Sequence, residues 1–165
     1  MNEAYISIGS NIDKRTNILA ALRWVRKLCT VVDVSSVYET TPVGCRHKES
    51  FFNAAVVVQT PLLPGQLKRS VLNVIEFRLR RRRSGDKNAP RTIDLDISLF
   101  NDSVLIMGHR RIPDPEISRF VHIAIPLAEI APYYIHPTTG EPLTVIATRL
   151  RQAGGIRVRK DIPLR

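Results

Sequence analysis

The sequence has few of the residues that mark secreted, disulfide-rich or membrane proteins. Only two of its 165 residues are cysteine, which is too few for a disulfide framework or a thiolate metal centre. Its longest apolar runs are short, such as Ala54 to Val58, whereas a membrane-spanning helix needs about 20 residues. No charged segment followed by an apolar one opens the chain, as a secretory signal would require. We therefore expect a cytoplasmic protein with reduced cysteines and no membrane partner.

Acidic residues are also scarce, since 15 Asp and Glu stand against 25 Lys and Arg, giving a formal net charge of +10. Six basic and two acidic residues give +4 to residues 76–87, and six basic and one acidic residue give +5 to residues 149–165. Charge this localised indicates a polyanionic partner, namely a nucleic acid, an acidic membrane surface or a phosphate-rich small molecule. We interpret residues from about 152 to 165 as a solvated basic C-terminal tail.

The remaining composition is that of one globular domain covering residues 1–165, with 44% hydrophobic and 24% charged residues. Alternation and helical periodicity predict the order strand, helix, strand, strand, helix, strand over residues 3–9, 14–28, 30–40, 51–60, 64–82 and 92–100. Because each helix lies between two strands, this order predicts an α+β fold with a ferredoxin-like βαββαβ core. Further helices, predicted at 116–131 and 143–151, would cover the free face of the sheet in a three-layer α/β/α arrangement.

The last predicted strand of this core carries two carboxylates. In T-I-D-L-D-I-S-L-F (residues 92–100), Asp94 and Asp96 point to one face, whereas Ile93, Leu95, Ile97 and Leu99 point to the other. Residues two apart on a strand are separated by about 6.6 Å between Cα atoms, so the two carboxylates can converge on one small volume. Like charges at this separation need a compensating cation, and Mg²⁺ is usually held by one or two carboxylates together with substrate phosphates.

Arginines flank the loop that leads into this strand. Arg81, Arg83 and Arg91 present guanidinium groups, which suit phosphate oxygens. Carboxylates for Mg²⁺ beside arginines for phosphate are typical of phosphoryl transfer, although the chain has no G-x-x-x-x-G-K-[ST] motif and is therefore not a P-loop enzyme. The alternative interpretation is that these residues have no functional role and form an edge strand of alternating charge beside solvated arginines.

The stretch K-N-A-P-R-T-I-D-L-D-I at residues 87–97 resembles the signature of the 6-hydroxymethyl-7,8-dihydropterin pyrophosphokinase family. Further matches lie in the expected order along the chain: Y-I-S-I-G-S-N (5–11), S-S-V-Y-E-T-T-P-V-G (35–44), F-N-A-A-V (52–56), I-E (75–76) and P-L-A-E-I-A-P (126–132). The resemblance covers about residues 4–132, and the last thirty residues are less diagnostic.

The resemblance implies an ATP-dependent transferase of folate biosynthesis, which moves the β,γ-diphosphoryl group of ATP to the hydroxymethyl oxygen of the pterin and releases AMP. Two Mg²⁺ ions would assist, with Asp94 and Asp96 matching their ligands and Arg81 and Arg91 matching the catalytic arginines. The residues that match the ATP site are Glu76, Arg83, Arg91, Ile97, Arg110 and Asp114. The residues that match the pterin site are Thr40, Pro42, Val43, Phe51, Asn53, Phe120 and His122.

Two departures from the family pattern concern these sites. The family usually has a histidine that contacts the ATP phosphates where this chain has Asp114, and a carboxylate cannot donate to phosphate as an imidazolium can. The pterin site should also hold a basic residue and a second stacking aromatic. Strict spacing puts Phe120 and His122 at those positions, and a one-residue slip would make Arg119 the basic residue. Whether Phe120 or His122 stacks on the pterin stays open.

Three hypotheses follow. The first is the pyrophosphokinase with its chemistry intact, and the second is a relative with altered pterin specificity or lost activity, for which Asp114 is the sole reason. The third is a ferredoxin-like nucleic-acid-binding module, but the aromatic-rich RNP1 pattern is absent and paired aspartates in a phosphate-binding groove would oppose it. We expect small-molecule substrates, no nucleic acid and a monomer.

Overall fold

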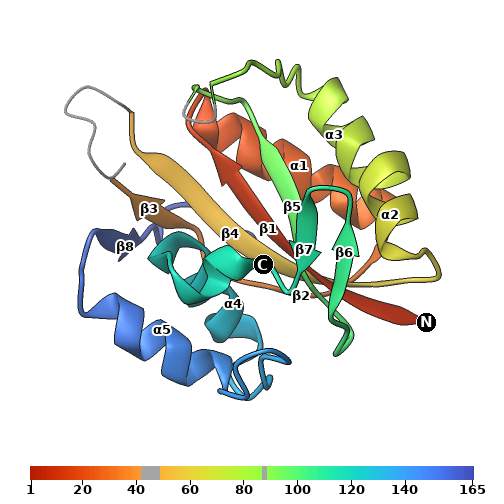
Figure 1. Cartoon of the computed structure of the whole chain (residues 1–165). Helices are drawn as coiled ribbons and strands as arrows, with labels where there is room; N and C mark the ends of the chain where they lie inside the picture. The colour runs from red at the N-terminus through yellow and green to blue at the C-terminus, as the bar shows by residue number, and fades with distance from the viewer. Residues whose placement is uncertain (42–48, 87–88) are drawn as a thin grey trace.

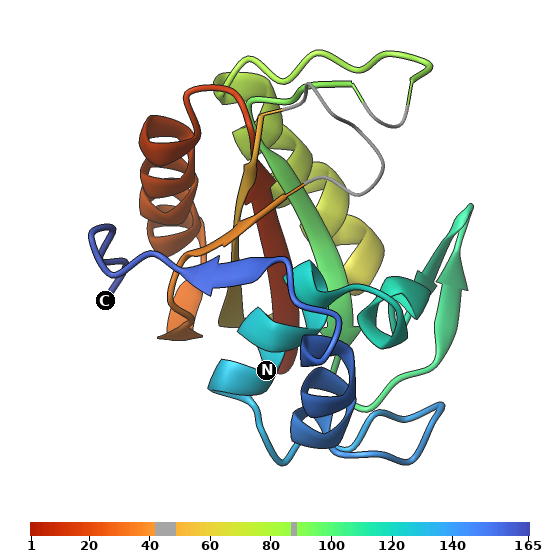
Figure 2. The same cartoon turned by 90° about the vertical axis from the view of Figure 1, so that its left-hand side faces the viewer.

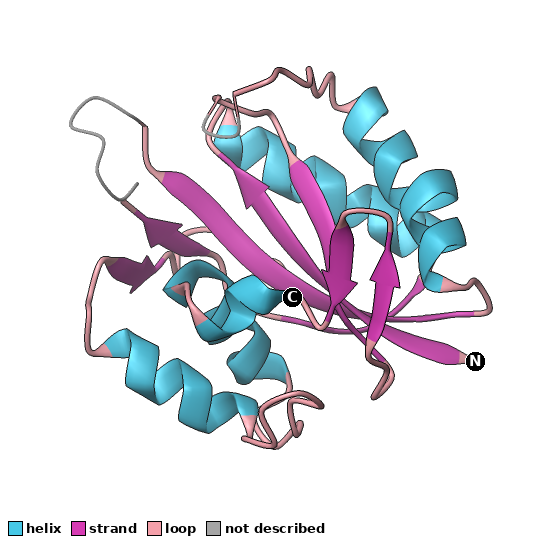
Figure 3. Ribbon diagram, in the orientation of Figure 1, coloured by secondary structure: helices cyan, strands magenta, loops and turns pink. Residues whose placement is uncertain are grey.

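A six-stranded antiparallel sheet forms the centre of the protein in a computed structural model, which describes residues 1–41, 49–86 and 89–165 (Figures 1 and 3). The strand order is β5-β1-β4-β3-β8, and β2 pairs with β4 next to β3. The strands are β1 (Asn2–Ser10), β2 (Thr30–Val34), β3 (Tyr38–Thr40), β4 (Phe51–Thr60), β5 (Asp94–Phe100) and β8 (Ile156–Val158). A separate hairpin consists of β6 (Leu105–Met107) and β7 (Arg110–Ile112). The strand predicted over 30–40 is therefore two short strands on the same edge of β4.

Helices cover both faces of this sheet, which gives the three layers that the sequence predicts (Figure 1). One face carries α1 (Lys14–Leu28) and a second helical stretch made of α2 (Pro64–Leu67), a π-helical segment η1 (Lys68–Leu72) and α3 (Asn73–Arg78). The other face carries a 3₁₀ turn η2 (Pro115–Ser118), α4 (Val121–Ile130) and α5 (Leu143–Arg151). The predicted α+β class with a covered ferredoxin-like core is confirmed. Within the described ranges, no helix has the length and apolar character needed to cross a membrane.

Two apolar cores lie on the opposite faces of the sheet because side chains alternate along its strands. Ile6 and Ile8 of β1 pack against α1 and α3 in the first core, whereas Tyr5 of the same strand packs against α4 in the second. Full burial of one such aliphatic side chain stabilises a fold by about 1.5–3 kcal/mol. The two cores therefore fix which side chains of each strand face which helical layer.

A β-bulge at Ser98 interrupts the alternation of β5. Tyr5 pairs with Leu99 and Ile6 pairs with Ile97, so Ser98 is the extra residue. Ile97 joins the first core but Leu99 joins the second, which corrects the prediction that all four apolar residues of this strand share one face. Asp94 and Asp96 precede the bulge, and their common face is unaffected.

The basic C-terminal segment is folded onto the domain, so the prediction of a solvated tail was wrong. Strand β8 pairs with β3 (Figure 2), bringing Arg157 opposite Glu39. The following residues Ile162 and Leu164 are buried in the first core. Arg157 Nη2 and Arg159 Nη1 lie 2.6 and 2.9 Å from Glu39 Oε2. The long-range pairing to Glu39 was not visible in the sequence because β8 has only three residues.

Glu39 also joins the two chain segments on either side of residues 41–49. Ser50 Oγ donates to Glu39 Oε1 at 2.5 Å, and Lys14 Nζ donates to Ser50 Oγ at 2.6 Å. The carboxylate thus holds the end of β3, the start of β4 and the C-terminal strand together. Burial alone would raise the pKa of Glu39, but hydrogen bonds from Ser50, Arg157 and Arg159 outweigh it and lower the pKa to about 2.

We predict that Glu39→Gln lowers the free energy of unfolding by about 1 kcal/mol at pH 7, because ion pairs with partly exposed arginines are lost. The stabilisation by ionised Glu39 is fully present above its ordinary pKa of 4.5 and is lost as the pH falls through about 2. The difference between the wild type and the variant should therefore shrink between pH 5 and pH 2. Urea denaturation at several pH values measures it, and a difference independent of pH would contradict the ionic role.

Candidate active site

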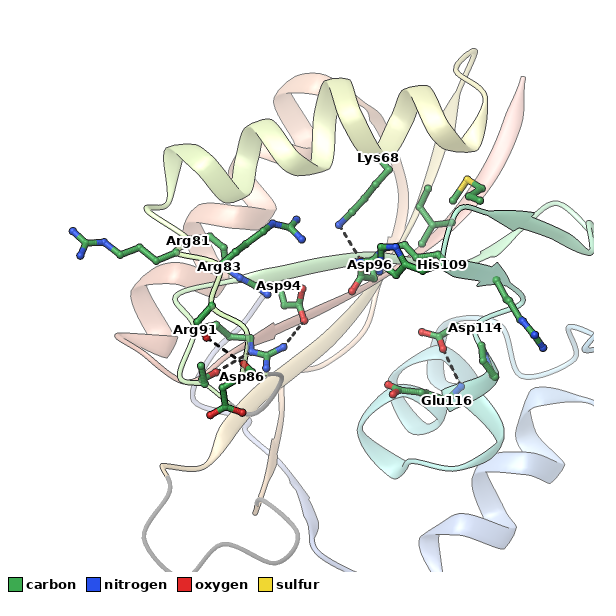
Figure 4. Close-up of a pocket in the computed structure, with 18 of the residues that line it drawn as sticks. Lys68, Arg81, Arg83, Asp86, Arg91, Asp94, Asp96, His109, Asp114 and Glu116 are labelled. Atoms are coloured by element: carbon green, nitrogen blue, oxygen red, sulfur yellow. Dashed lines mark hydrogen bonds and ion pairs between the residues drawn. The ribbon is translucent and has the colours of Figure 1, made fainter.

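Asp94 and Asp96 line a cavity of about 580 Å³ at the outer edge of β5 (Figure 4). Their side chains keep 27% and 22% of their surface exposed, so both carboxylates are accessible from the cavity. Each carboxylate is held by two cations. Asp94 lies 2.9 Å from Nη1 of both Arg81 and Arg91, and Asp96 contacts Lys68 Nζ at 2.9 Å and also Arg110. The structure thus brings the predicted acids and arginines together around one cavity.

The electrostatics of this cluster keep Asp94 ionised. Burial raises the pKa of its carboxyl, but the charges and hydrogen bonds of Arg81 and Arg91 outweigh burial and hold the pKa below its ordinary value. The arginines that would bind phosphate are therefore engaged with the carboxylates that would bind a metal ion.

Arg91 is positioned by the turn that follows β1. Asn11 Oδ1 accepts the Arg91 backbone N–H at 2.7 Å, while the Arg91 carbonyl accepts the N–H groups of Asn11 and Ile12 at 3.1 and 3.2 Å. Ser10 Oγ donates to the Thr92 carbonyl at 2.5 Å. Sequence analysis assigned no role to Ser10 or Asn11, although both lie in the G-S-N stretch that matches the family. The turn fixes the backbone from which Arg91 reaches Asp94.

Glu76 ties α3 to the free edge of β5. Its side chain is buried, and its Oε1 accepts the Leu95 backbone N–H at 2.8 Å while its Oε2 accepts from Arg83 Nη2 at 2.9 Å. Arg83 itself keeps 59% of its side chain exposed. The buried glutamate therefore anchors a solvent-facing arginine at the cavity rim. Lys68, which sequence analysis missed, lies 3.6 Å from Glu76 Oε1.

The opposite wall of the cavity comes from β7 and η2. Arg110 and Asp114 line this wall together with His109, to which sequence analysis assigned no role, whereas Ile97 lines the cavity from β5. Asp114 Oδ1 accepts the Glu116 backbone N–H at 2.9 Å and so caps η2. Burial, with the negative charges of Glu116 and Asp96, raises the pKa of Asp114 to about 6 despite the opposing influence of that hydrogen bond and of Arg110.

Among the predicted pterin-side residues, Phe51 lies next to the Arg91 side chain of this cavity, whereas Thr40 and Asn53 do not line it. The Arg91 guanidinium lies 5.9 Å from the Phe51 ring centre, and the buried Asn53 donates from Nδ2 to Thr40 Oγ1 at 2.8 Å. Pro42 and Val43 lie outside the described residues.

Phe120 and His122 stack on each other, with ring centres 5.4 Å apart and planes inclined by 25°. Burial and the nearby charge of Arg91 lower the pKa of His122, which keeps the imidazole neutral. Arg119 is exposed, with its guanidinium 5.5 Å from the Phe120 ring centre. The charges of Arg91 and Asp94 both act on the His122 imidazole, which therefore lies near that ion pair.

The donor chemistry of the cavity suits magnesium bound together with a polyphosphate. Among the residues that the structure describes, no three His, Cys, Asp or Glu side chains converge as a protein-only metal site. Asp94 and Asp96 supply hard oxygen donors that are partly exposed to the cavity, and Mg²⁺ characteristically combines one or two carboxylates with waters and phosphates. A covered ferredoxin-like fold with this pairing of acids and arginines defines a class of protein that binds metal-bound polyphosphate.

The family model for 7,8-dihydro-6-hydroxymethylpterin-pyrophosphokinase (HPPK) matches residues 5–132. The chain therefore belongs to this family, and the family inferred from the motifs is confirmed. The matched segment includes β5, both carboxylates and the arginines that contact them.

Curated relatives carry the same name or a broader one. The chain is 40% identical over 132 residues to the Bacillus subtilis 2-amino-4-hydroxy-6-hydroxymethyldihydropteridine pyrophosphokinase, covering 78% of each protein. It is 32% identical over 144 residues to the Aquifex aeolicus protein of the same name, covering 87% of this chain and 89% of that one. It is also 36% identical over 138 residues to the Dictyostelium discoideum folic acid synthesis protein FOL1, covering 83% of this chain but only 21% of FOL1.

Solved structures share the fold. The wild-type Plasmodium falciparum HPPK-DHPS matches with a TM-score of 0.74 at 16% identity, over 90% of this chain and 41% of that one. An HPPK-DHPS crystallised in complex with substrates matches with a TM-score of 0.73 at 18% identity, over 97% of this chain and 46% of that one. The chain thus spans less than half of these longer proteins.

We predict that Asp114→Asn stabilises the fold at pH 7 by about 1–2 kcal/mol, because it removes a partly buried charge near Asp96 but keeps the helix cap. A carboxyl with a raised pKa binds its proton more tightly in the folded state, so wild-type stability falls as the pH rises from 3.8 to about 6. The advantage of the variant should therefore vanish near pH 4. Thermal unfolding between pH 4 and pH 7 measures it, and an equal advantage at both ends would refute the assignment.

Proposed function

We propose that this chain transfers the β,γ-diphosphoryl group of ATP to the hydroxymethyl oxygen of 6-hydroxymethyl-7,8-dihydropterin, releasing AMP and the pterin diphosphate for folate biosynthesis. Family membership supports the reaction class. The observation that carries the proposal is the cavity in which Asp94 and Asp96 face Arg81, Arg91 and Arg110. The protein acts in the cytoplasm as a monomer on small-molecule substrates.

Asp94 and Asp96 would hold two Mg²⁺ ions, which neutralise triphosphate charge and polarise the transferred group when they are bound. The carboxylates meet this requirement without large movement, because both already face the cavity with part of their surface exposed. Arg81 and Arg91 act as the catalytic arginines and exchange the Asp94 carboxylate for phosphate oxygens. This exchange preserves the charge balance of the site while it places guanidinium groups where negative charge develops.

The remaining nucleotide contacts come from the cavity walls. Arg83 and Arg110 reach phosphate from opposite sides, and Ile97 provides an apolar surface. Glu76 acts indirectly, because its carboxylate holds Arg83 at the rim. Asp114 stands where the family usually has histidine, and with a pKa of about 6 its carboxyl donates a hydrogen bond to phosphate only when it is protonated at mildly acidic pH.

The pterin occupies the side of the cavity beside Phe51, where Asn53 and Thr40 offer polar groups to its edge, with Pro42 and Val43 completing this side. We assign the second stacking position to His122 rather than to Phe120. The support is electrostatic proximity, since the charges of Arg91 and Asp94 both act on His122. Phe120 stacks on the His122 ring.

We predict that Asp94→Ala and Asp96→Ala each lower kcat by about 10³-fold or more, because each removes a ligand for an ion that stabilises transition-state charge. Release of AMP from ATP, Mg²⁺ and the hydroxymethyl dihydropterin measures the rate. Wild-type rates in either variant would refute the metal role. A folded wild-type protein that releases no AMP would instead indicate a relative with another pterin or without activity.

We predict that His122→Ala raises the KM for the pterin about tenfold and leaves the KM for ATP nearly unchanged, because it removes a stacking surface worth about 1–1.5 kcal/mol. His122→Phe keeps a ring and should restore the pterin KM. Phe120→Ala serves as the comparison, and a larger pterin effect from this variant than from His122→Ala would assign the stacking position to Phe120.

A further inference from the structure

Lys68 is a buried cation that the mechanism above does not use. It is only 9% exposed and begins the π-helical segment η1 between α2 and α3. Lysine is almost never buried to this extent without partners, because removing an ammonium from water is costly. π-helical turns within longer helices are rare and occur frequently at functional sites.

The Lys68 ammonium has two hydrogen-bond acceptors on β5 and one ion-pair partner on α3. Nζ donates to the Leu95 carbonyl on the free edge of β5 and to Asp96 Oδ1 at 2.9 Å. The ion-pair partner, Glu76 Oε1 at 3.6 Å, accepts the Leu95 N–H at 2.8 Å. Lys68 and Glu76 together satisfy both outward backbone groups of Leu95. The ammonium is therefore fixed in place independently of its contact with Asp96.

This arrangement has a direct consequence for Asp96. One oxygen of a carboxylate proposed to hold metal is already bound to a fixed positive charge that also lies beside the cavity (Figure 4). Arg110 contacts the same oxygen from β7, but 31% of its side chain is exposed, whereas only 11% of the Lys68 side chain is. Arg110 can turn towards an incoming phosphate, whereas Lys68 is enclosed by its acceptors.

We propose that Lys68 is a positioning residue that makes metal loading at Asp96 depend on bound nucleotide. This inference rests on the proposed function. While no nucleotide is present, the ammonium neutralises Asp96 and weakens its attraction for a free divalent cation. A bound triphosphate adds negative charge next to Asp96, so that the metal ion enters together with the nucleotide. Lys68 keeps its contacts with Leu95 and Glu76 and continues to orient Asp96.

Manganese binding followed by electron paramagnetic resonance tests this inference without catalysis. Mn²⁺ is titrated into wild type, Lys68→Met and Lys68→Gln, with and without α,β-methylene-ATP, which cannot be cleaved at the reacting bond. Met preserves the length of the buried side chain, and Gln preserves a hydrogen-bond donor without the charge. Lys27→Met, on the exposed surface of α1, is the matched control. Thermal unfolding verifies that each variant is folded. If Lys68→Met does not fold, Lys68→Gln alone tests the inference.

We expect the wild type and Lys27→Met to bind Mn²⁺ weakly alone and tightly with the analogue. Both Lys68 variants should bind Mn²⁺ alone about 10- to 100-fold more tightly than the wild type, because no charge-assisted bond to Asp96 opposes the ion. Their affinity in the presence of the analogue should change less than about threefold. The nucleotide dependence of metal loading would then be largely abolished.

Two other outcomes are distinguishable. If the Lys68 variants match the wild type without nucleotide while all of them bind Mn²⁺ with the analogue, the role of Lys68 is overturned and the proposed function stands. If the wild type takes up no Mn²⁺ with the analogue, or Asp96→Asn takes it up as the wild type does, the metal role of Asp96 fails. The inference about Lys68 then fails with it.

Discussion

The proximity of two like charges on β5 is the constraint on which the rest of the site depends. Asp94 and Asp96 lie on one face of a strand, about 6.6 Å apart between Cα atoms, and two negative charges at this separation repel each other unless cations compensate them. Each receives two cations: Arg81 and Arg91 hold Asp94, and Lys68 and Arg110 hold Asp96. These cations come from four different places in the chain. Ion pairs with these two carboxylates thus connect the helical layer, the loop before β5 and the β6–β7 hairpin at one site.

The edge position of β5 makes this convergence possible. An edge strand presents unpaired backbone groups, which proteins usually cover or protect. Here side chains cover them: Glu76 accepts the Leu95 N–H, Lys68 donates to the Leu95 carbonyl and Arg81 donates to the Ile93 carbonyl at 2.6 Å. The same side chains contact the carboxylates or the cavity. Structural protection of the strand and construction of the site are therefore performed by one set of bonds.

The features predicted correctly from sequence are those that local pattern determines. Alternation of apolar and acidic residues is sufficient to place Asp94 and Asp96 on a common face, because the side-chain period of a strand is two. The bulge at Ser98 depends on how β1 pairs with β5, at the step from Tyr5 to Ile6, and no local pattern encodes this pairing. Lys68 escaped notice for a similar reason. A lysine in an amphipathic helix normally faces solvent, and only the tertiary contact with Asp96 and Leu95 explains its burial.

The fold shows which positive charges are paired within the protein and which ones lie beside the cavity. The net charge of +10 indicated a polyanionic partner in general. However, several arginines of the basic C-terminal segment form ion pairs within the protein, since Arg157 and Arg159 bind Glu39 and Arg149 binds Glu141. The cations around Asp94 and Asp96 differ from these, because their acceptors face a cavity large enough for a nucleotide. In the proposed mechanism, a carboxylate that binds a metal ion releases its arginine, and the released arginine binds phosphate. Four cations around two carboxylates give this cluster an excess of positive charge before any ligand arrives, and that excess favours the binding of a polyphosphate.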